Sequence, residues 1–215
     1  MESCKRALIV TSIASDDHPV LTNIAKDSIA NRVDFIMVGD TKSPATFHLA
    51  GCEFLSLEDQ RKLDFRFSEL APVRHYSRKN IGYLQAFRKG YQVIQETDDD
   101  NIPLQPFWLD YDFDRHGEGF ENTGWTNIYR YFTDTFIWPR GFPLDRILEK
   151  NEIPSSRLNK FCPIIQGLAD ENPDVDAIYR LTMELPVYFN KSERYYILGS
   201  GASVSYTHLT LPTKA

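Results

Sequence analysis

Three adjacent aspartates, Asp98, Asp99 and Asp100, are the residues of this sequence whose type and spacing most clearly indicate chemistry. They directly follow residues 91–97, which we predict to form a strand. Adjacent carboxylates repel one another unless water solvates them or a cation bridges them. Oxygen ligands of this kind suit Mg²⁺ or Mn²⁺, and either ion can also hold a diphosphate. A solvated acidic turn is the alternative interpretation.

A basic cluster precedes the aspartates, at the start of a helix predicted over residues 76–89. Its members are Arg74, His75, Arg78 and Lys79. Cations are unfavourable beside the positive end of a helix dipole, unless they serve an anion that also binds the free backbone N–H groups. Beside a metal held by the aspartates, such a cluster is what a nucleoside diphosphate needs. A solvated basic turn remains the alternative for Arg74 alone.

The elements that must position these clusters alternate between strands and helices. Strands are expected at residues 7–14, 34–39, 52–56 and 91–97, and helices at 19–30 and 76–89. This order predicts an α/β fold with a mostly parallel sheet. Ligands of such open sheets bind beyond the carboxyl ends of the strands, where the three aspartates fall. The pattern beyond Asn101 is less regular, residues 116–119 are expected to form a loop, and no linker indicates a second domain.

The composition excludes several classes of protein. With 30 acidic and 24 basic residues the net charge is −6, which argues against a general nucleic-acid or anionic-membrane binder. The three cysteines, Cys4, Cys52 and Cys162, lie far apart and lack zinc-ligand spacing, which indicates a reduced, cytoplasmic chain in which they are packing residues. The apolar residues 7–14 are too few to span a membrane and precede no cleavage site.

The end of the chain differs in character from the rest. Residues 204–213 resemble a transposon-derived sequencing adaptor, so we expect residues 204–215 to be non-native and residues 1–203 to form one domain that is incomplete at its C-terminus. Without Lys214 the net charge becomes −7. The alternative is an amphipathic edge strand with Val204, Tyr206 and His208 on one face.

Four ordered blocks of this sequence, supported by the loop at residues 38–44, resemble the STELLO (DUF288) glycosyltransferase-like family. The blocks are residues 78–86, 96–103, 138–144 and 166–182. The resemblance covers about residues 5–198. This family is related to the reversibly glycosylated polypeptides, which are UDP-arabinopyranose mutases. The resemblance implies a GT-A fold, Rossmann-like with helices on both faces of the sheet, a nucleotide-sugar donor of the UDP type and a divalent metal, Mn²⁺ or Mg²⁺.

The resemblance also implies roles for single residues. The metal-binding carboxylates would be Asp98 and Asp100. The donor-binding residues would be Asp40, Arg78, Lys79, Asn80, Asp99 and Arg140. The catalytic residues, facing the sugar or the acceptor, would be Asp174 and Asp176. The alternatives are a helix N-cap for Asp174 and a structural turn for Arg140 with Gly141.

These observations predict a metal-dependent glycosyltransferase that uses a nucleotide sugar, with a glycan, a protein or a small molecule as acceptor. One alternative is a mutase that interconverts ring forms of a UDP-sugar and needs no separate acceptor. Another is a non-catalytic regulator that keeps the fold and scaffolds other glycosyltransferases. The family's C-terminal blocks, which should follow near Gly199, are absent.

Overall fold

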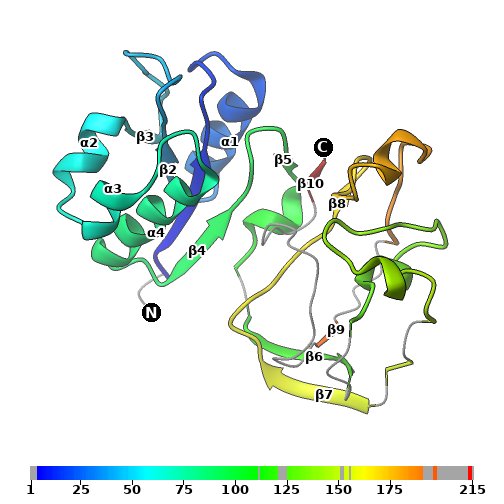
Figure 1. Cartoon of the computed structure of the whole chain (residues 1–215). Helices are drawn as coiled ribbons and strands as arrows, with labels where there is room; N and C mark the ends of the chain where they lie inside the picture. Colours follow the sequence, from blue (N-terminus) through cyan, green and yellow to red (C-terminus); the bar gives the residue numbers. More distant parts are fainter. Residues whose placement is uncertain are drawn as a thin grey trace. The chain divides into compact units, whose positions relative to one another are not determined.

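The chain divides into two compact units in a computed structural model (Figure 1). The units are Met1–Leu109 and Asp110–Ala215. The structure describes residues 4–110, 112–120, 125–150, 153–154, 156–190, 196–197 and 213–214. Most of the predicted adaptor-like tail, residues 204–212 and 215, therefore lies outside the described residues.

A parallel sheet forms the centre of the first unit. Its strands, in the order β3-β2-β1-β4, are β1 (Arg6–Thr11), β2 (Asp34–Val38), β3 (Cys52–Leu55) and β4 (Val93–Glu96). All three neighbouring pairs are parallel. Residues 7–10 are fully buried, as expected for a short apolar strand covered on both faces. The predicted strands and their parallel arrangement are confirmed.

Helices cover both faces of this sheet. α1 (Pro19–Ala30) links β1 to β2, and α4 (Lys79–Arg88), preceded by the 3₁₀ turn η1 (Tyr76–Arg78), leads from β3 across to β4. These two connections run in opposite directions along the sheet, so right-handed crossovers place α1 and α4 on opposite faces. Among the described residues, no helix is long and apolar enough to cross a membrane.

Two short helices were not expected from the sequence. They are α2 (Leu57–Lys62) and α3 (Arg66–Leu70), which lie between β3 and η1. A capping box starts α2, because Ser56 Oγ accepts from the Asp59 N–H and the Asp59 carboxylate accepts from the Ser56 N–H, both at 3.1 Å. α2 thereby carries Gln60 into the interior, where its side chain is fully buried.

Two short elements complete the first unit, and the second unit is built mainly from short elements. β5 (Ile102–Pro103) and η2 (Gln105–Trp108) end the first unit. In the second, β6 (Asp114–Gly119) pairs with β7 (Ser156–Phe161) and β9 (Tyr196–Ile197), and β8 (Ala169–Asp170) pairs with β10 (Thr213–Lys214). Its 3₁₀ turns are η3 (Ile128–Tyr131), η4 (Leu144–Arg146) and η5 (Tyr179–Leu181). The expectation of a loop at residues 116–119 is wrong, because β6 pairs with β7 through them.

Candidate functional site

The candidate site lies between β1 and β4, where the order in which the chain adds strands to the first sheet changes direction. β1 has β2 on one side and β4 on the other, and the connections to these two neighbours pass over opposite faces. This is a topological switch point, where loops at the carboxyl ends of the strands separate and leave room for a ligand. Ser12 follows β1, and Asp98–Asp100 follow β4 after Thr97. The structure thus confirms the predicted position of the three aspartates.

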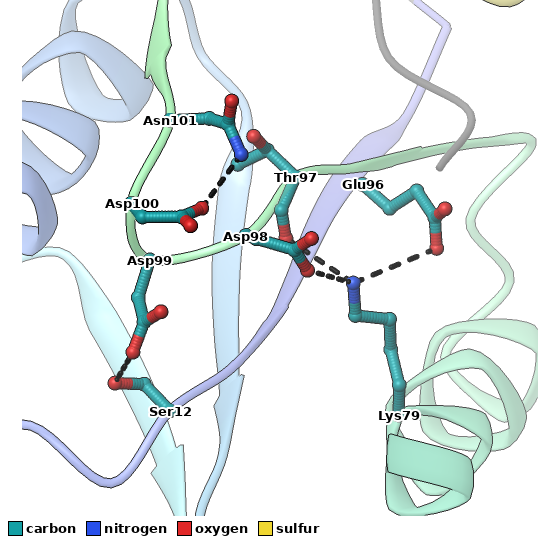
Figure 2. Close-up of polar contacts among 8 residues, drawn as sticks. All are labelled: Ser12, Lys79, Glu96, Thr97, Asp98, Asp99, Asp100 and Asn101. Atoms are coloured by element: carbon teal, nitrogen blue, oxygen red, sulfur yellow. Dashed lines mark hydrogen bonds and ion pairs between the residues drawn. The ribbon is translucent and has the colours of Figure 1, made fainter. Parts of the chain in front are cut away.

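The three aspartates turn toward different partners (Figure 2). Asp98 Oδ1 accepts a hydrogen bond of 2.8 Å from Lys79 Nζ. Asp99 accepts a short hydrogen bond from the Ser12 hydroxyl, and Asp100 Oδ1 accepts one of 2.7 Å from the Asn101 side-chain amide. The carboxylates therefore diverge from one another, although they are adjacent in the sequence.

Lys79 is the member of the basic cluster that reaches the aspartates. It lies in the first turn of α4 and is only 7% exposed. Besides Asp98, its ammonium contacts Thr97 O at 3.3 Å and lies 4.0 Å from Glu96 Oε2 (Figure 2). An ammonium leaves water only when anionic or carbonyl oxygens compensate for the lost hydration, and this cage provides three such groups.

Arg78, the neighbouring residue, is directed to other protein groups. Its guanidinium donates to Gln60 Oε1 through Nε, at 3.0 Å, and through a second nitrogen, and to Ala71 O at 3.0 Å. Gln60 in turn donates to the carbonyls of Gly39 and Leu55, so Arg78 holds α2 against the ends of β2 and β3. Burial lowers the pKa of the Arg78 guanidinium from its usual value, partly offset by the charge of Asp40. The role of Arg78 in donor binding stays a prediction.

A chain of hydrogen bonds joins the loops at this edge of the sheet. The Asp40 N–H donates to Ser43 Oγ at 2.8 Å, and the Ser43 hydroxyl donates to Ser12 O at 3.1 Å. The Asp40 carboxylate accepts from the Arg74 N–H at 2.6 Å. Because Ser12 also contacts Asp99, the chain connects the loops after β1, β2 and β4 and places Asp40 at the same edge as the aspartates.

Three residues of this edge were not identified from the sequence as site residues. Ser12 and Gln60 hold Asp99 and Arg78, as described above. The third is Thr97, which is fully buried and whose hydroxyl has no hydrogen-bond partner among the described residues. A polar residue directly after a buried strand is the signal that could have identified Ser12 and Thr97. The predicted donor-binding residue Asn80 is exposed in the first turn of α4.

The remaining predicted site residues belong to the second unit. Arg140 Nε forms an ion pair with Asp174 Oδ1 at 2.6 Å, so the structure brings these two residues together. Asp176 Oδ1 accepts from the N–H groups of Ile178 and Tyr179, at 2.8 and 3.2 Å, where η5 begins. The capping alternative for Asp174 is wrong for this turn, because the N-cap residue of η5 is Ile178 and the N–H groups at its start are bonded by Asp176.

The aspartates fit a divalent metal in donor chemistry but do not form a ready-made cage. Among the described residues, no three His, Cys, Asp or Glu side chains converge in a way that could hold a metal ion. Mg²⁺, however, is commonly held by only one or two carboxylates together with substrate phosphates and water. Asp98 and Asp100, beside the unpartnered Thr97 hydroxyl, suit such a partial site.

Two curated proteins of Arabidopsis thaliana are similar in sequence to this chain. Probable glycosyltransferase STELLO2 is 30% identical over 162 residues, and the match covers 68% of this chain and 21% of the relative. Probable glycosyltransferase STELLO1 is 29% identical over 167 residues, with the same coverage. The chain is a distant homologue of the STELLO proteins. No family model matches it.

This homology confirms the family resemblance found in the sequence blocks. The chain spans about a fifth of the length of the STELLO proteins that it matches. The structure adds a parallel α/β sheet with helices packed against it and polar loops at its switch point. The GT-A fold named from the resemblance stays a prediction.

Proposed function

We propose that the chain is the donor-binding part of a glycosyltransferase that uses a UDP-type nucleotide sugar and Mn²⁺ or Mg²⁺. One observation carries the proposal: the aspartates after β4, Lys79 from α4 and the loops after β1 and β2 meet at the switch point of a parallel sheet. The homologues, which are named probable glycosyltransferases, support it.

The proposed reaction transfers the sugar to a hydroxyl group of an acceptor. The hydroxyl oxygen bonds to the anomeric carbon, the bond between that carbon and the diphosphate oxygen breaks, UDP leaves with the electron pair, and the hydroxyl proton passes to a base. Negative charge grows on the diphosphate as this bond breaks, and the Lys79 ammonium, which pairs with Asp98, is proposed to stabilise that charge. A divalent ion held by Asp98 and Asp100 would supply Lewis-acid stabilisation of the same leaving group.

The other predicted residues have narrower parts in this proposal. Asp40 would contact the base or the ribose, and Asn80 and Arg78 would orient the sugar and the phosphates. Asp174 and Asp176 are proposed to face the sugar or the acceptor. The Arg140–Asp174 ion pair would then hold the Asp174 carboxylate in place.

Calorimetric titration with UDP, with and without Mn²⁺, tests the donor site. We expect metal-dependent binding that is lost in Asp98→Ala/Asp100→Ala. The matched control is Glu58→Ala/Glu69→Ala, which removes two exposed carboxylates from α2 and α3 of the same unit. Binding that does not depend on metal, or that survives the aspartate substitutions, would contradict the metal-dependent donor site.

Turnover of a UDP-sugar separates transfer from the other activities. Free UDP that forms only after an acceptor is added supports a transferase. Conversion of the sugar ring without release of UDP would assign a mutase, and binding without either product would assign a regulator.

A further inference from the structure

Asp98, one of the two carboxylates proposed to bind a metal, is already paired with an ammonium. Asp98 Oδ1 lies 2.8 Å from Lys79 Nζ, a direct ion pair. The side chains of Lys79 and Asp98 are 8% and 28% exposed, so water screens this pair only weakly. A divalent ion binding to Asp98 would meet a positive charge at the same carboxylate, and the two cations would repel each other.

Lys79 cannot simply withdraw into solvent. It is 7% exposed, and the first turn of α4 fixes its backbone at this edge of the sheet. If its ammonium releases Asp98, it needs another anion close by. Glu96 Oε2 is 4.0 Å away, and a diphosphate bound at the switch point would be a second candidate.

We propose that Lys79 and a divalent cation compete for Asp98, so that metal binding releases the Lys79 ammonium toward the diphosphate of the donor. This inference rests on the metal-binding part of the proposed function. Before the metal binds, Lys79 holds Asp98 in place and keeps the affinity for metal alone low.

The competition predicts tighter metal binding when the ammonium is removed. The test variant is Lys79→Met/Glu96→Gln, in which the second substitution removes the buried carboxylate that lies 4.0 Å from the ammonium and keeps the net charge unchanged. We expect the Kd of Mn²⁺ for the full chain, without nucleotide, to fall about tenfold. Adding Asp98→Asn to this variant should abolish the gain. Electron paramagnetic resonance of free Mn²⁺ gives the Kd without any measurement of activity.

A second ion pair, at the other end of α4, provides the matched control. Lys89, directly after α4, pairs with Glu53 of β3. Lys89→Met/Glu53→Gln removes the same two kinds of charge away from the aspartates and should leave the Kd of Mn²⁺ unchanged. Thermal melting followed by circular dichroism verifies that each variant is folded.

Each outcome separates this inference from the proposed function. If Mn²⁺ binds the wild-type chain through Asp98 but the Kd is unchanged or higher in Lys79→Met/Glu96→Gln, the competition is overturned and the metal site stands. If no variant binds Mn²⁺, both the metal site and the competition are overturned. If the control variant gains as much affinity as the test variant, the effect is not specific to Lys79 and the competition is overturned.

Discussion

At the scale of single residues, environment decides what each ionisable group can do. Lys79 is buried among oxygens and pairs with Asp98, whereas the neighbouring Arg78 uses its donors on Gln60 and Ala71. Burial also changes the acidity of a cysteine, Cys52. Burial, with a smaller contribution from the charge of Glu53, raises the pKa of the Cys52 thiol from 9.0 to about 12, while a backbone hydrogen bond with Met37 acts in the other direction.

The raised pKa of Cys52 predicts a loss of stability at high pH. Below pH 9 the thiol is neutral in the folded and in the unfolded chain, so its contribution to the free energy of unfolding is fully present there. Between pH 9 and pH 12 the unfolded chain loses this proton and the folded chain keeps it, so the free energy of unfolding falls as pH rises. We expect a loss of about 1 kcal/mol from pH 8 to pH 10 that is missing in Cys52→Ala.

Urea unfolding of both proteins at several pH values measures this difference. The comparison with Cys52→Ala is needed because burial also raises the pKa of Tyr91 and of Tyr129. Parallel pH profiles for wild type and variant would contradict the prediction.

At the scale of elements, α4 positions the site because it packs closely on the sheet. Gly82 faces β1 and β2, and a Cβ added to it would lie 2.5 Å from Ile9 Cγ2 and 2.9 Å from Val38 Cγ2. Both neighbours are fully buried core side chains and have little room to move. The absence of a side chain at Gly82 is therefore what allows the first turn of α4 to bring Lys79 to Asp98.

Gly82→Ala should destabilise the protein although alanine favours helices. The gain in helix propensity is about 1 kcal/mol, whereas overpacking a core costs about 1–3 kcal/mol and also displaces α4. We expect a net decrease in the free energy of unfolding, measured with urea, and weaker UDP binding. Asn80→Ala, at an exposed position of the same helix, is the control for stability and should be neutral or slightly stabilising. An increase in stability for Gly82→Ala would show that α4 is not closely packed.

At the scale of the whole molecule, the candidate site residues divide between the two compact units. Ser12, Asp40, Lys79 and the three aspartates lie in the first unit, and Arg140, Asp174 and Asp176 lie in the second. The first unit includes the residues just beyond the aspartates, because the Arg6 guanidinium donates to Trp108 O at 2.8 Å and the Gln95 amide donates to Phe107 O.

A fragment of residues 1–109 should therefore fold by itself. We expect cooperative thermal unfolding and a dispersed two-dimensional NMR spectrum, since the fragment contains the whole parallel sheet and both of its helical layers. A fragment of residues 1–100 is the control. It should be much less stable, because Arg6 and Gln95 lose their carbonyl partners at Trp108 and Phe107. A disordered 1–109 fragment would contradict the independence of the first unit.

Local patterns in the sequence determined the elements of the first unit. The helix predicted at residues 19–30 is α1, and the four predicted strands match β1–β4 to within a few residues. Such signals act over a few residues, through apolar periodicity and the first-turn proline, and so can be read without tertiary contacts. The position of the aspartates after β4 followed from the same information. The capping box of α2 is also a local signal, formed by Ser56 and Asp59.

Only the tertiary structure decided which side chains meet. Arg78 and Lys79 are neighbours in the sequence, but successive helical residues point about 100° apart, so the rotation of the helix on the sheet determines which of them faces Asp98. That rotation depends on packing between distant segments, such as Gly82 against Ile9 and Val38. The contact between Ser12 and Asp99 likewise joins residues 87 positions apart. The sequence by itself thus determined the elements and the edge at which the site lies, whereas long-range packing selected the partner of each charge.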